Sequence, residues 1–431
     1  FALMERRSFL KSSIGASLAL VGGISSLRAA YAFSNTAVRP GLDAPSSNLV
    51  ITKISYYAAP GYTKPLFNQA RGIVVVHTNK GITGVGEGGS PDTIRQCAEM
   101  LIGEDPFRIE HLWQLLYRGM FYPAGREKLH AIGGIEMALW DIKGKALNAP
   151  VYELLGGSTR NFVECYATGY RPSKATTEEG RAKDCIKDGF RCYRIGPTGG
   201  GRNSKTFEPF AHTKSTIEYC KRINDAVGGN GNWAIDIHTR FDFPEAIRIC
   251  NQLEQMEPYF VEDIVRSENV AAYSNIRKMT RVPIAVGEQF GDKWDINEFI
   301  EKEWIDFSRV TLPNCGGISE LKKIIALAET HYVGNIPHFT GPLSTAALVH
   351  VLGSSTSSKC LMELAGGVVE RPAYFQKDYM LFEKGRLYLN PAPGLGVEFY
   401  PEKADLLMEI TENTKYPHPT LEAPDGSLRN W

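Results

Sequence analysis

The sequence lacks the cysteine patterns of zinc sites and disulfide frameworks. It has eight cysteines in 431 residues, and no two of them form a CxxC pair or a tight cluster. Structural zinc sites and small disulfide-rich domains both need closely spaced cysteines. We therefore expect neither, and we interpret the cysteines as small core residues.

The sequence also lacks net charge. Its 48 basic residues balance its 48 acidic residues, so no strong overall field attracts a polyanion. We expect no nucleic-acid partner. The glycine-rich stretch 84–89 lacks the Lys-Ser/Thr ending of a phosphate-binding loop, and we interpret it as a turn.

No hydrophobic run is long enough to span a bilayer comfortably. The longest candidate, residues 14–24, follows Arg6 and Arg7 and precedes a small-x-small site at 30–32. This three-part pattern resembles a twin-arginine export signal. We interpret residues 1–32 as a signal peptide and 33–48 as a flexible lead, and we expect a periplasmic protein without membrane attachment after processing.

Residues 49–160 predict an α+β domain. Three strands, 51–57, 72–78 and 82–87, precede helical stretches near 92–102, 107–117 and 128–147. The turn at 79–81 ends in glycine and indicates a hairpin between the second and third strands. The C-terminal segment, 376–431, returns to strand and turn, and we expect it to pack on this first domain.

Residues 161–375 repeat a strand followed by a helix. Asp236, Glu262 and Glu288 each follow a short apolar run, at intervals of 26 residues. Four further polar residues end similar runs: Arg194, Thr311, His338 and Glu363. About eight such parallel units close a barrel, and its catalytic groups belong at the carboxyl ends of the strands.

The three equally spaced acids predict a metal site. Equal spacing brings them to the same end of successive strands, and carboxylate oxygens are the ligands that Mg²⁺ prefers. A set of salt bridges at the barrel mouth is the other interpretation of the same residues.

Three motifs carry a family resemblance: Ala-Leu-Trp-Asp-Ile-Lys-Gly-Lys-Ala at 138–146, Gly-Gly-Ile-Ser-Glu at 316–320 and Pro-Gly-Leu-Gly-Val-Glu at 393–398. With the order of strand-end residues, they resemble the enolase superfamily, and within it the mandelate racemase group and its galactonate dehydratase-like members. The resemblance covers about residues 49–431. It implies a capping domain over a (β/α)₇β barrel, Mg²⁺ as the cofactor and a sugar acid as the substrate.

The resemblance also implies roles for individual residues. Asp236, Glu262 and Glu288 match the metal ligands, His238 the general acid and His338 the base that takes the α-proton. Glu363 matches the acid that hydrogen-bonds the substrate carboxylate. Removal of the α-proton gives an enediolate, and loss of the β-hydroxyl then gives a 2-keto-3-deoxy acid.

Three residues depart from this pattern. Thr311 stands where the resemblance implies an aspartate that would hydrogen-bond the catalytic histidine. Arg194 occupies a position at which other branches place a lysine base, and Arg309 lies two residues before Thr311. Because arginine stays protonated, we interpret Arg194 and Arg309 as substrate-binding residues. Structural ion pairs with the neighbouring acids are the other interpretation of both arginines.

Other functions remain open from the sequence. The same site would serve a racemase or epimerase, a barrel with paired carboxylates also suits a glycoside hydrolase, and Thr311 suggests a non-catalytic acid-sugar-binding protein. The first-domain segments 61–69 and 119–128 are candidates for substrate specificity. The resemblance further implies a homo-oligomer.

Overall fold

The computed structural model describes residues 47–62, 71–119, 121–199, 206–338, 341–414 and 421–429. The expected signal peptide and nearly all of the expected lead lie outside these ranges, as does most of segment 61–69. Within the described ranges, the helices fall short of the length and apolar character that crossing a bilayer requires.

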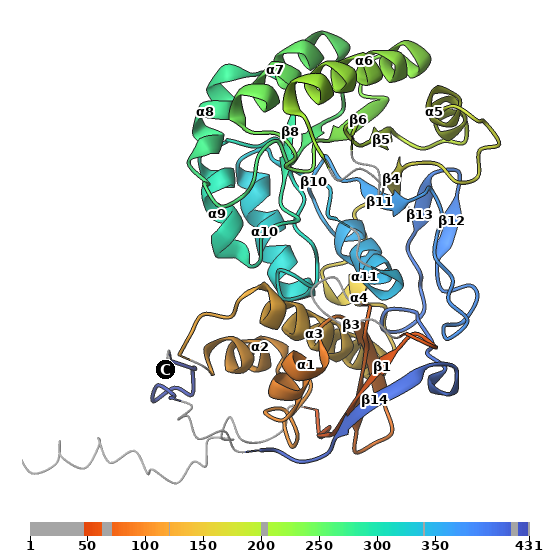
Figure 1. Cartoon of the computed structure of the whole chain (residues 1–431). Coiled ribbons are helices and arrows are strands. Elements are labelled where there is room, and N and C mark those ends of the chain that lie inside the picture. The colour runs from red at the N-terminus through yellow and green to blue at the C-terminus, as the bar shows by residue number, and fades with distance from the viewer. Residues whose placement is uncertain are drawn as a thin grey trace, which may run out of the picture. The chain divides into compact units, whose positions relative to one another are not determined.

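An antiparallel sheet forms the centre of the cap (Figure 1). Within the described residues it has four strands in the order β14-β1-β2-β3. They are β1 (Ile51–Ala58), β2 (Ile73–Thr78), β3 (Thr83–Glu87) and β14 (Asp405–Ile410). Gly81 has a φ of +77° in the turn between β2 and β3, as the expected hairpin requires.

Four helices complete the described part of the cap: α1 (Pro91–Ala98), α2 (Ile109–Arg118), α3 (Arg126–Ala146) and α4 (Val151–Leu154). Ser90 and Thr93 form a reciprocal capping box that starts α1. Helix α3 packs tightly on β3, where a Cβ on Gly86 would lie 1.9 Å from the Gly134 carbonyl oxygen. The stretch 84–89 was predicted to be a turn, but residues 84–87 belong to β3, and the close approach of α3 explains the glycine at position 86.

The second part of the described chain alternates eight parallel strands with seven helices (Figure 1). The strands are β4 (Phe162–Thr168), β5 (Tyr193–Ile195), β6 (Trp233–Asp236), β7 (Val261–Glu262), β8 (Ile284–Val286), β9 (Phe307–Ser308), β10 (Gly334–Asn335) and β11 (Met362–Ala365). The helices are α5 (Glu178–Lys187), α6 (Pro209–Val227), α7 (Phe243–Leu253), α8 (Ala272–Met279), α9 (Lys293–Glu301), α10 (Ile318–Thr330) and α11 (Pro342–Gly353), with short 3₁₀ turns η1 (Glu254–Met256) and η2 (Pro401–Lys403).

The strands close into a barrel. Strand β11 pairs with β4, and a parallel bridge between Asn335 and Cys360 joins β10 to the start of β11. This closure confirms the predicted (β/α)₇β barrel with its α+β cap.

One apolar layer fills the barrel. Each of the eight strand positions contributes one member: Tyr166, Cys192, Ala234, Phe260, Ala285, Phe307, Ile336 and Leu361. Such a filled layer makes the barrel a packed core rather than a pore. The polar residues of the barrel mouth lie next to this layer.

The C-terminal segment, which we expected to pack on the first domain, divides between the two parts of the molecule. Its hairpin, β12 (Leu381–Glu383) and β13 (Arg386–Tyr388), pairs antiparallel with β4 of the barrel. Its last strand, β14, pairs with β1 of the cap. The segment therefore ties the barrel to the cap.

Two glutamates of the cap bind the amino ends of barrel helices. Glu136 of α3 accepts hydrogen bonds from the backbone N–H groups of Ile318 (2.7 Å) and Ser319 (2.9 Å) at the start of α10. Glu87 at the end of β3 accepts one from Ser344 N (3.0 Å) at the start of α11. The N-cap residue of each helix is a glycine, which has no side chain for this task. The cap supplies the capping carboxylates instead.

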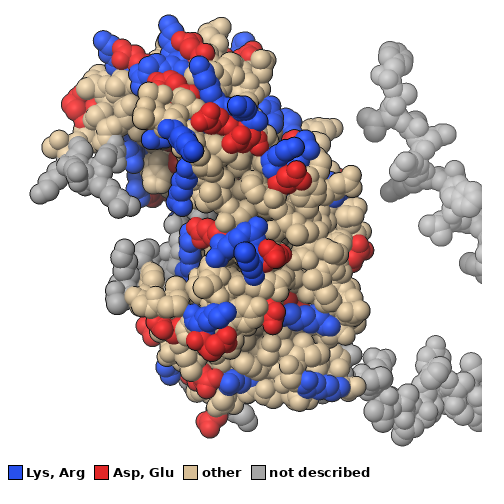
Figure 2. Space-filling model, turned by 90° about the vertical axis from the view of Figure 1, so that its right-hand side faces the viewer, with Lys and Arg blue, Asp and Glu red and all other residues tan. Residues whose placement is uncertain are grey.

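The surface carries interspersed charges on the face that Figure 2 shows. Lysine and arginine side chains lie beside aspartate and glutamate side chains across much of it. This mixture agrees with the zero net charge of the sequence.

Candidate functional site

The polar mouth of the barrel lies two residues beyond the apolar layer. Side chains two residues apart on a strand point to the same face. The residues two positions further along are Thr168, Arg194, Asp236, Glu262, Gly287, Arg309, His338 and Glu363. Six of the eight predicted site residues belong to this set, and the contacts below bring them together.

Two arginines and two glutamates form a buried ring of charges. Arg194 contacts Glu262 Oε2 (2.6 Å) and Glu363 Oε1 (3.1 Å) through its two terminal nitrogens. Arg309 contacts the remaining oxygen of each glutamate, Glu262 Oε1 and Glu363 Oε2, the latter at 2.8 Å. The ring places Arg194 and Arg309 against the protein's own carboxylates.

The neighbours of the ring fix its geometry. Thr168 Oγ1 accepts a hydrogen bond from Arg194 Nε (2.9 Å) and donates one to Glu363 Oε1 (2.5 Å). Arg309 also donates to the Tyr166 hydroxyl in the apolar layer. Although burial opposes ionisation, the two guanidinium groups hold the pKa of Glu363 well below its usual range.

Three more carboxylates surround the ring. Asp236 contacts Arg194 through Oδ2 (3.0 Å), Glu288 Oε2 lies 3.5 Å from Arg309, and Asp263 accepts a hydrogen bond from Gln289 Nε2 (3.1 Å). Burial raises the pKa of Asp263, and the negative charges of Glu288 and Asp236 raise it further. The mouth therefore brings five carboxyl groups together with two guanidinium groups, and burial raises the pKa of Asp236 and Glu262 as well as that of Asp263.

Gly287 explains the position of Glu288. Strand β8 ends at Val286, and Gly287 has a φ of +156°. A Cβ there would lie 2.7 Å from the Arg309 backbone nitrogen, so the neighbouring chain leaves room only for glycine. Glu288 consequently lies one residue beyond the positions that Asp236 and Glu262 occupy.

Two imidazole rings lie near opposite oxygens of Glu288. His338 Nε2 is 3.4 Å from Oε2, and His238 Nε2 is 3.9 Å from Oε1. The His338 side chain is 13% exposed, and its partial burial lowers its pKa, which favours the neutral imidazole that can accept a proton. The His238 side chain is 59% exposed, at a φ of +54° just beyond the end of β6.

Thr311, where the resemblance implies an aspartate, is fully buried. Its Oγ1 has no hydrogen-bond partner among the described residues.

The carboxylates fit a divalent cation by charge and by donor type. Asp236, Glu262 and Asp263 each offer an oxygen within 4.8 Å of the others. Glu288, the third predicted ligand, is outside this group but interacts electrostatically with Asp236 and Glu262. Two of these oxygens, Asp236 Oδ1 and Asp263 Oδ1, are buried without a hydrogen-bond partner among the described residues. Buried carboxylates without partners are costly unless a cation neutralises them. Asp236 and Glu262 belong to the predicted metal set, and Asp263 joins them here.

Sequence reasoning missed Asp263. It follows Glu262 directly, and strict alternation along β7 would direct it to the opposite face. Its φ of +44° breaks the alternation and turns the carboxylate toward the other acids. The signal in the sequence that could have identified Asp263 is its position directly after Glu262, the acid at the end of the strand.

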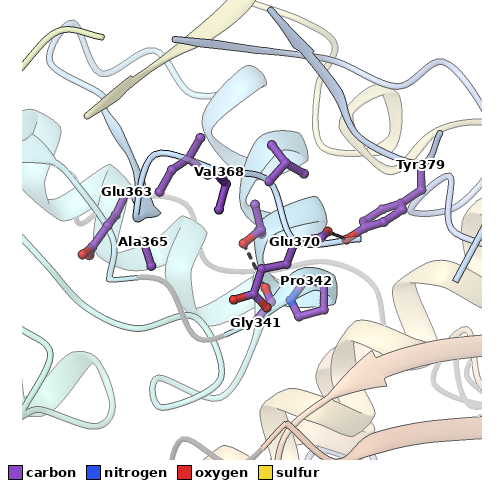
Figure 3. A pocket seen from close by; sticks show the side chains of 10 residues that line it. Gly341, Pro342, Glu363, Ala365, Val368, Glu370 and Tyr379 are labelled. Atoms are coloured by element: carbon purple, nitrogen blue, oxygen red, sulfur yellow. Dashed lines mark hydrogen bonds between the residues drawn. The ribbon is translucent and has the colours of Figure 1, made fainter. Parts of the chain in front are cut away.

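A small cavity of about 20 Å³ lies on the far side of Glu363. Figure 3 shows the Glu363 carboxylate directed away from Glu370 and Tyr379, which line the same hollow. The volume suits one water molecule.

Comparisons with known proteins cover both parts of the chain. A family model described as mandelate racemase/muconate lactonizing enzyme, N-terminal domain, matches residues 65–156, and one described as enolase C-terminal domain-like matches residues 178–404. The chain is 32% identical over 398 residues to a D-galactonate dehydratase of Pectobacterium atrosepticum, and the alignment covers 88% of this chain and 100% of the relative.

Two solved structures are similar in fold. An enolase from Pantoea ananatis with bound D-gluconate and Mg has a TM-score of 0.72 at 25% identity, covering 89% of this chain and 100% of that one. A 3,6-anhydro-D-galactonate cycloisomerase from Zobellia galactanivorans has a TM-score of 0.70 at 28% identity, covering 83% and 99%. The similarity extends over the cap and the barrel together.

Proposed function

The chain belongs to the mandelate racemase/muconate lactonizing enzyme family of the enolase superfamily, and we propose that it is a Mg²⁺-dependent dehydratase, a hydro-lyase that acts on a sugar acid. A relative named D-galactonate dehydratase and a fold neighbour holding D-gluconate and Mg support this substrate class. The observation that carries the proposal is the pair of imidazoles beside Glu288, next to a group of buried carboxylates.

The cation would lie among the three predicted ligands, Asp236, Glu262 and Glu288. When bound, it supplies the positive charge that stabilises the negative charge developing on a substrate carboxylate during loss of its α-proton. The carboxylates of the protein provide the oxygens that such an ion prefers.

His338 is suited to accept the α-proton at Nε2. Its ring is neutral because burial lowers its pKa, and the nearby charges of Glu288 and Glu363 favour the protonated ring once the proton has arrived. A base positioned in this way adds about 10²–10⁴-fold to a rate.

His238 is suited to protonate the departing β-hydroxyl. Its exposed ring exchanges protons with solvent, and it lies on the other side of Glu288 from His338. Loss of the hydroxyl as water then leaves an enol that becomes a 2-keto-3-deoxy acid.

The two arginines hold the acids of the mouth in place. Each already contacts at least two carboxylates, so neither offers a full set of donors to a substrate. Their part in substrate binding stays a prediction. Glu363, held by both, retains its charge and its position.

A screen of aldonic and uronic-derived acids with Mg²⁺ tests the proposal. We expect a 2-keto-3-deoxy product, detected as a semicarbazone or thiobarbiturate adduct, and loss of turnover with EDTA. A product epimeric to the substrate, without a keto group, would instead establish a racemase or epimerase, which also uses two imidazoles. Turnover that resists chelation would favour a glycoside hydrolase. A chain that exchanges no α-hydrogen with deuterated solvent for any acid would be a binding protein.

We also propose that the chain is exported to the periplasm and assembles as a homo-oligomer. The pattern of residues 4–32 supports export. Cell fractionation of the full chain beside an Arg6→Lys/Arg7→Lys variant tests the location, and light scattering of the purified protein tests the assembly.

A further inference from the structure

Asp263 is a buried carboxylate that lacks a cationic partner. Only 1% of its surface is exposed, and no lysine, arginine or histidine nitrogen among the described residues lies within 4.0 Å of its oxygens. Its Oδ2 accepts one hydrogen bond from Gln289, and its Oδ1 has no hydrogen-bond partner among the described residues. Burial of an ionised carboxylate in this state is unfavourable unless a positive charge is added.

The backbone holds Asp263 in the mouth. A φ of +44° is uncommon for a residue other than glycine, and two hydrogen bonds fix it: Asp263 N donates to Ala285 O (3.1 Å), and Thr239 N donates to Asp263 O (2.9 Å). Uncommon backbone conformations of this kind persist where the surrounding structure over-determines them, often at functional sites.

Glu262, unlike Asp263, already has cationic partners. Each of its two oxygens already contacts a guanidinium group, Oε2 that of Arg194 and Oε1 that of Arg309. A further cation at Glu262 alone would therefore meet two positive groups. Asp236 Oδ1 and Asp263 Oδ1 are the neighbouring oxygens that are still without a partner among the described residues.

We propose that Asp263 is a direct ligand of the divalent cation, which it shares with Asp236. This inference rests on the cation of the proposed function, and it adds a ligand that neither equal spacing nor strand alternation predicted. The acid next to the strand-end glutamate thus supplies the oxygen that Glu262, engaged by two arginines, is least able to supply.

Binding of Mn²⁺ alone, without substrate, tests this role. Free and bound Mn²⁺ are counted by electron paramagnetic resonance for the full chain and for Asp263→Asn, Asp263→Glu and Asp105→Asn. Asp105→Asn is the control, because it makes the same change at a buried aspartate of the cap. We expect Asp263→Asn to raise the Kd for Mn²⁺ by at least about tenfold, since changes at the outer partners of metal ligands already cost about 10–100-fold. Asp263→Glu should retain more affinity than Asp263→Asn, and Asp105→Asn should bind as the unaltered chain does.

Melting temperatures separate ligation from a structural role. Without metal, Asp263→Asn should melt at or above the temperature of the unaltered chain, because it removes one of several crowded negative charges. Its rise in melting temperature on addition of Mn²⁺ should be smaller, because that rise follows the affinity. A Kd within threefold of the unaltered chain, whether or not the metal-free variant is destabilised, would overturn the inference. If Asp263→Asn does not fold, Asp263→Glu decides the question. The inference would then be overturned if Asp263→Glu bound Mn²⁺ at least about a thousand times more weakly than the unaltered chain.

The outcome for the proposed function is distinct. An unaltered chain that binds no Mn²⁺ would contradict the metal dependence itself. An unaltered chain that binds Mn²⁺ and dehydrates a sugar acid, beside an Asp263→Asn variant with normal affinity, would leave the function intact and remove only Asp263 as a ligand.

Discussion

At the scale of single residues, Arg309 is the centre of the charge network. It is fully buried and contacts Glu262, Glu363 and the hydroxyl of Tyr166, with Glu288 at 3.5 Å. Removing one partner of a buried ion pair leaves an uncompensated charge, which costs far more than the pair itself contributes.

We expect Arg309→Met to lower the free energy of unfolding by about 3–5 kcal/mol. Urea denaturation at pH 7 with EDTA measures this, and added Mg²⁺ should restore part of the loss by neutralising the same acids. Arg266→Met serves as a control, because Arg266 pairs with Glu268 at the exposed surface and should change nothing measurable. Equal stability of Arg309→Met and the unaltered chain would mean that the surrounding carboxylates are protonated.

The two histidines should separate the two proton transfers. His338→Asn should abolish exchange of the α-hydrogen with deuterated solvent and lower kcat by about 10²–10⁴-fold. His238→Asn should retain the exchange and lose dehydration. Nuclear magnetic resonance of the substrate measures exchange, and the keto product measures dehydration. Full turnover by His338→Asn would assign the base elsewhere.

Residues of the mouth were predictable from the sequence only where strand alternation holds. Arg194, Asp236, Glu262 and Glu363 end recognisable apolar runs, so their meeting at one edge follows from the strand period. Ion pairs at the barrel mouth were one interpretation of the sequence, but the sequence does not show which acid each arginine contacts. Asp263 was missed because its positive φ violates the alternation on which the reasoning depended.

At the scale of secondary-structure elements, Glu87 couples a strand of the cap to a helix of the barrel. It accepts a hydrogen bond from Ser344 N at the start of α11, yet it is almost completely buried. Burial raises its pKa from 4.5 to about 7. In the unfolded chain the same carboxyl ionises near its ordinary pKa.

The stability of the protein should therefore depend on the ionisation of Glu87 at pH values between these two pKa values. A carboxyl whose pKa is raised by folding contributes stability that is fully present below the unfolded pKa and is lost as the pH rises through the folded pKa. We expect the contribution of Glu87 to the free energy of unfolding to fall by up to about 3 kcal/mol between pH 4.5 and pH 7. Glu87→Gln, which cannot ionise, should flatten this slope in urea titrations at a series of pH values.

Glu402→Gln provides the matched comparison, because Glu402 lies exposed in η2. It should leave the slope as it is in the unaltered chain. The interpretation fails if Glu87→Gln and Glu402→Gln show the same pH dependence.

Helices and strands with a clear sequence pattern were predictable, but the residues at which they end were less so. The hairpin of β2 and β3 lies where the turn at 79–81 predicted it, and helix α3 lies within two residues of the expected 128–147. Equal spacing of Asp236, Glu262 and Glu288 predicted equivalent positions, but Gly287 adds a residue at the end of β8 and moves Glu288 outward. A local backbone feature of this kind leaves no trace in residue spacing.

At the scale of the whole molecule, the C-terminal strand completes the cap. Strand β14 pairs with β1, and Lys53 contacts Glu409 across this pairing at 2.6 Å. Without β14, β1 would become an edge strand with unpaired N–H and C=O groups, which promotes association between chains.

A chain that ends after Lys403 should therefore lower the melting temperature by several degrees and aggregate on heating. Differential scanning calorimetry and light scattering measure the two effects. A chain that ends after Asn413 keeps β14 and should retain most of the stability. The role of β14 would be refuted if the shorter chain melted at the temperature of the longer one.

The pairing of β1 with β14 also has a consequence for biosynthesis. Strand β1, at residues 51–58, can pair with β2 soon after both are translated, but it can pair with β14 only after residue 410 has been translated. Neighbouring barrel strands, by contrast, follow one another along the nascent chain. Contacts between distant residues form late, because closing a long loop is entropically unfavourable. Synthesis of the cap sheet thus starts before that of the barrel strands and ends after it.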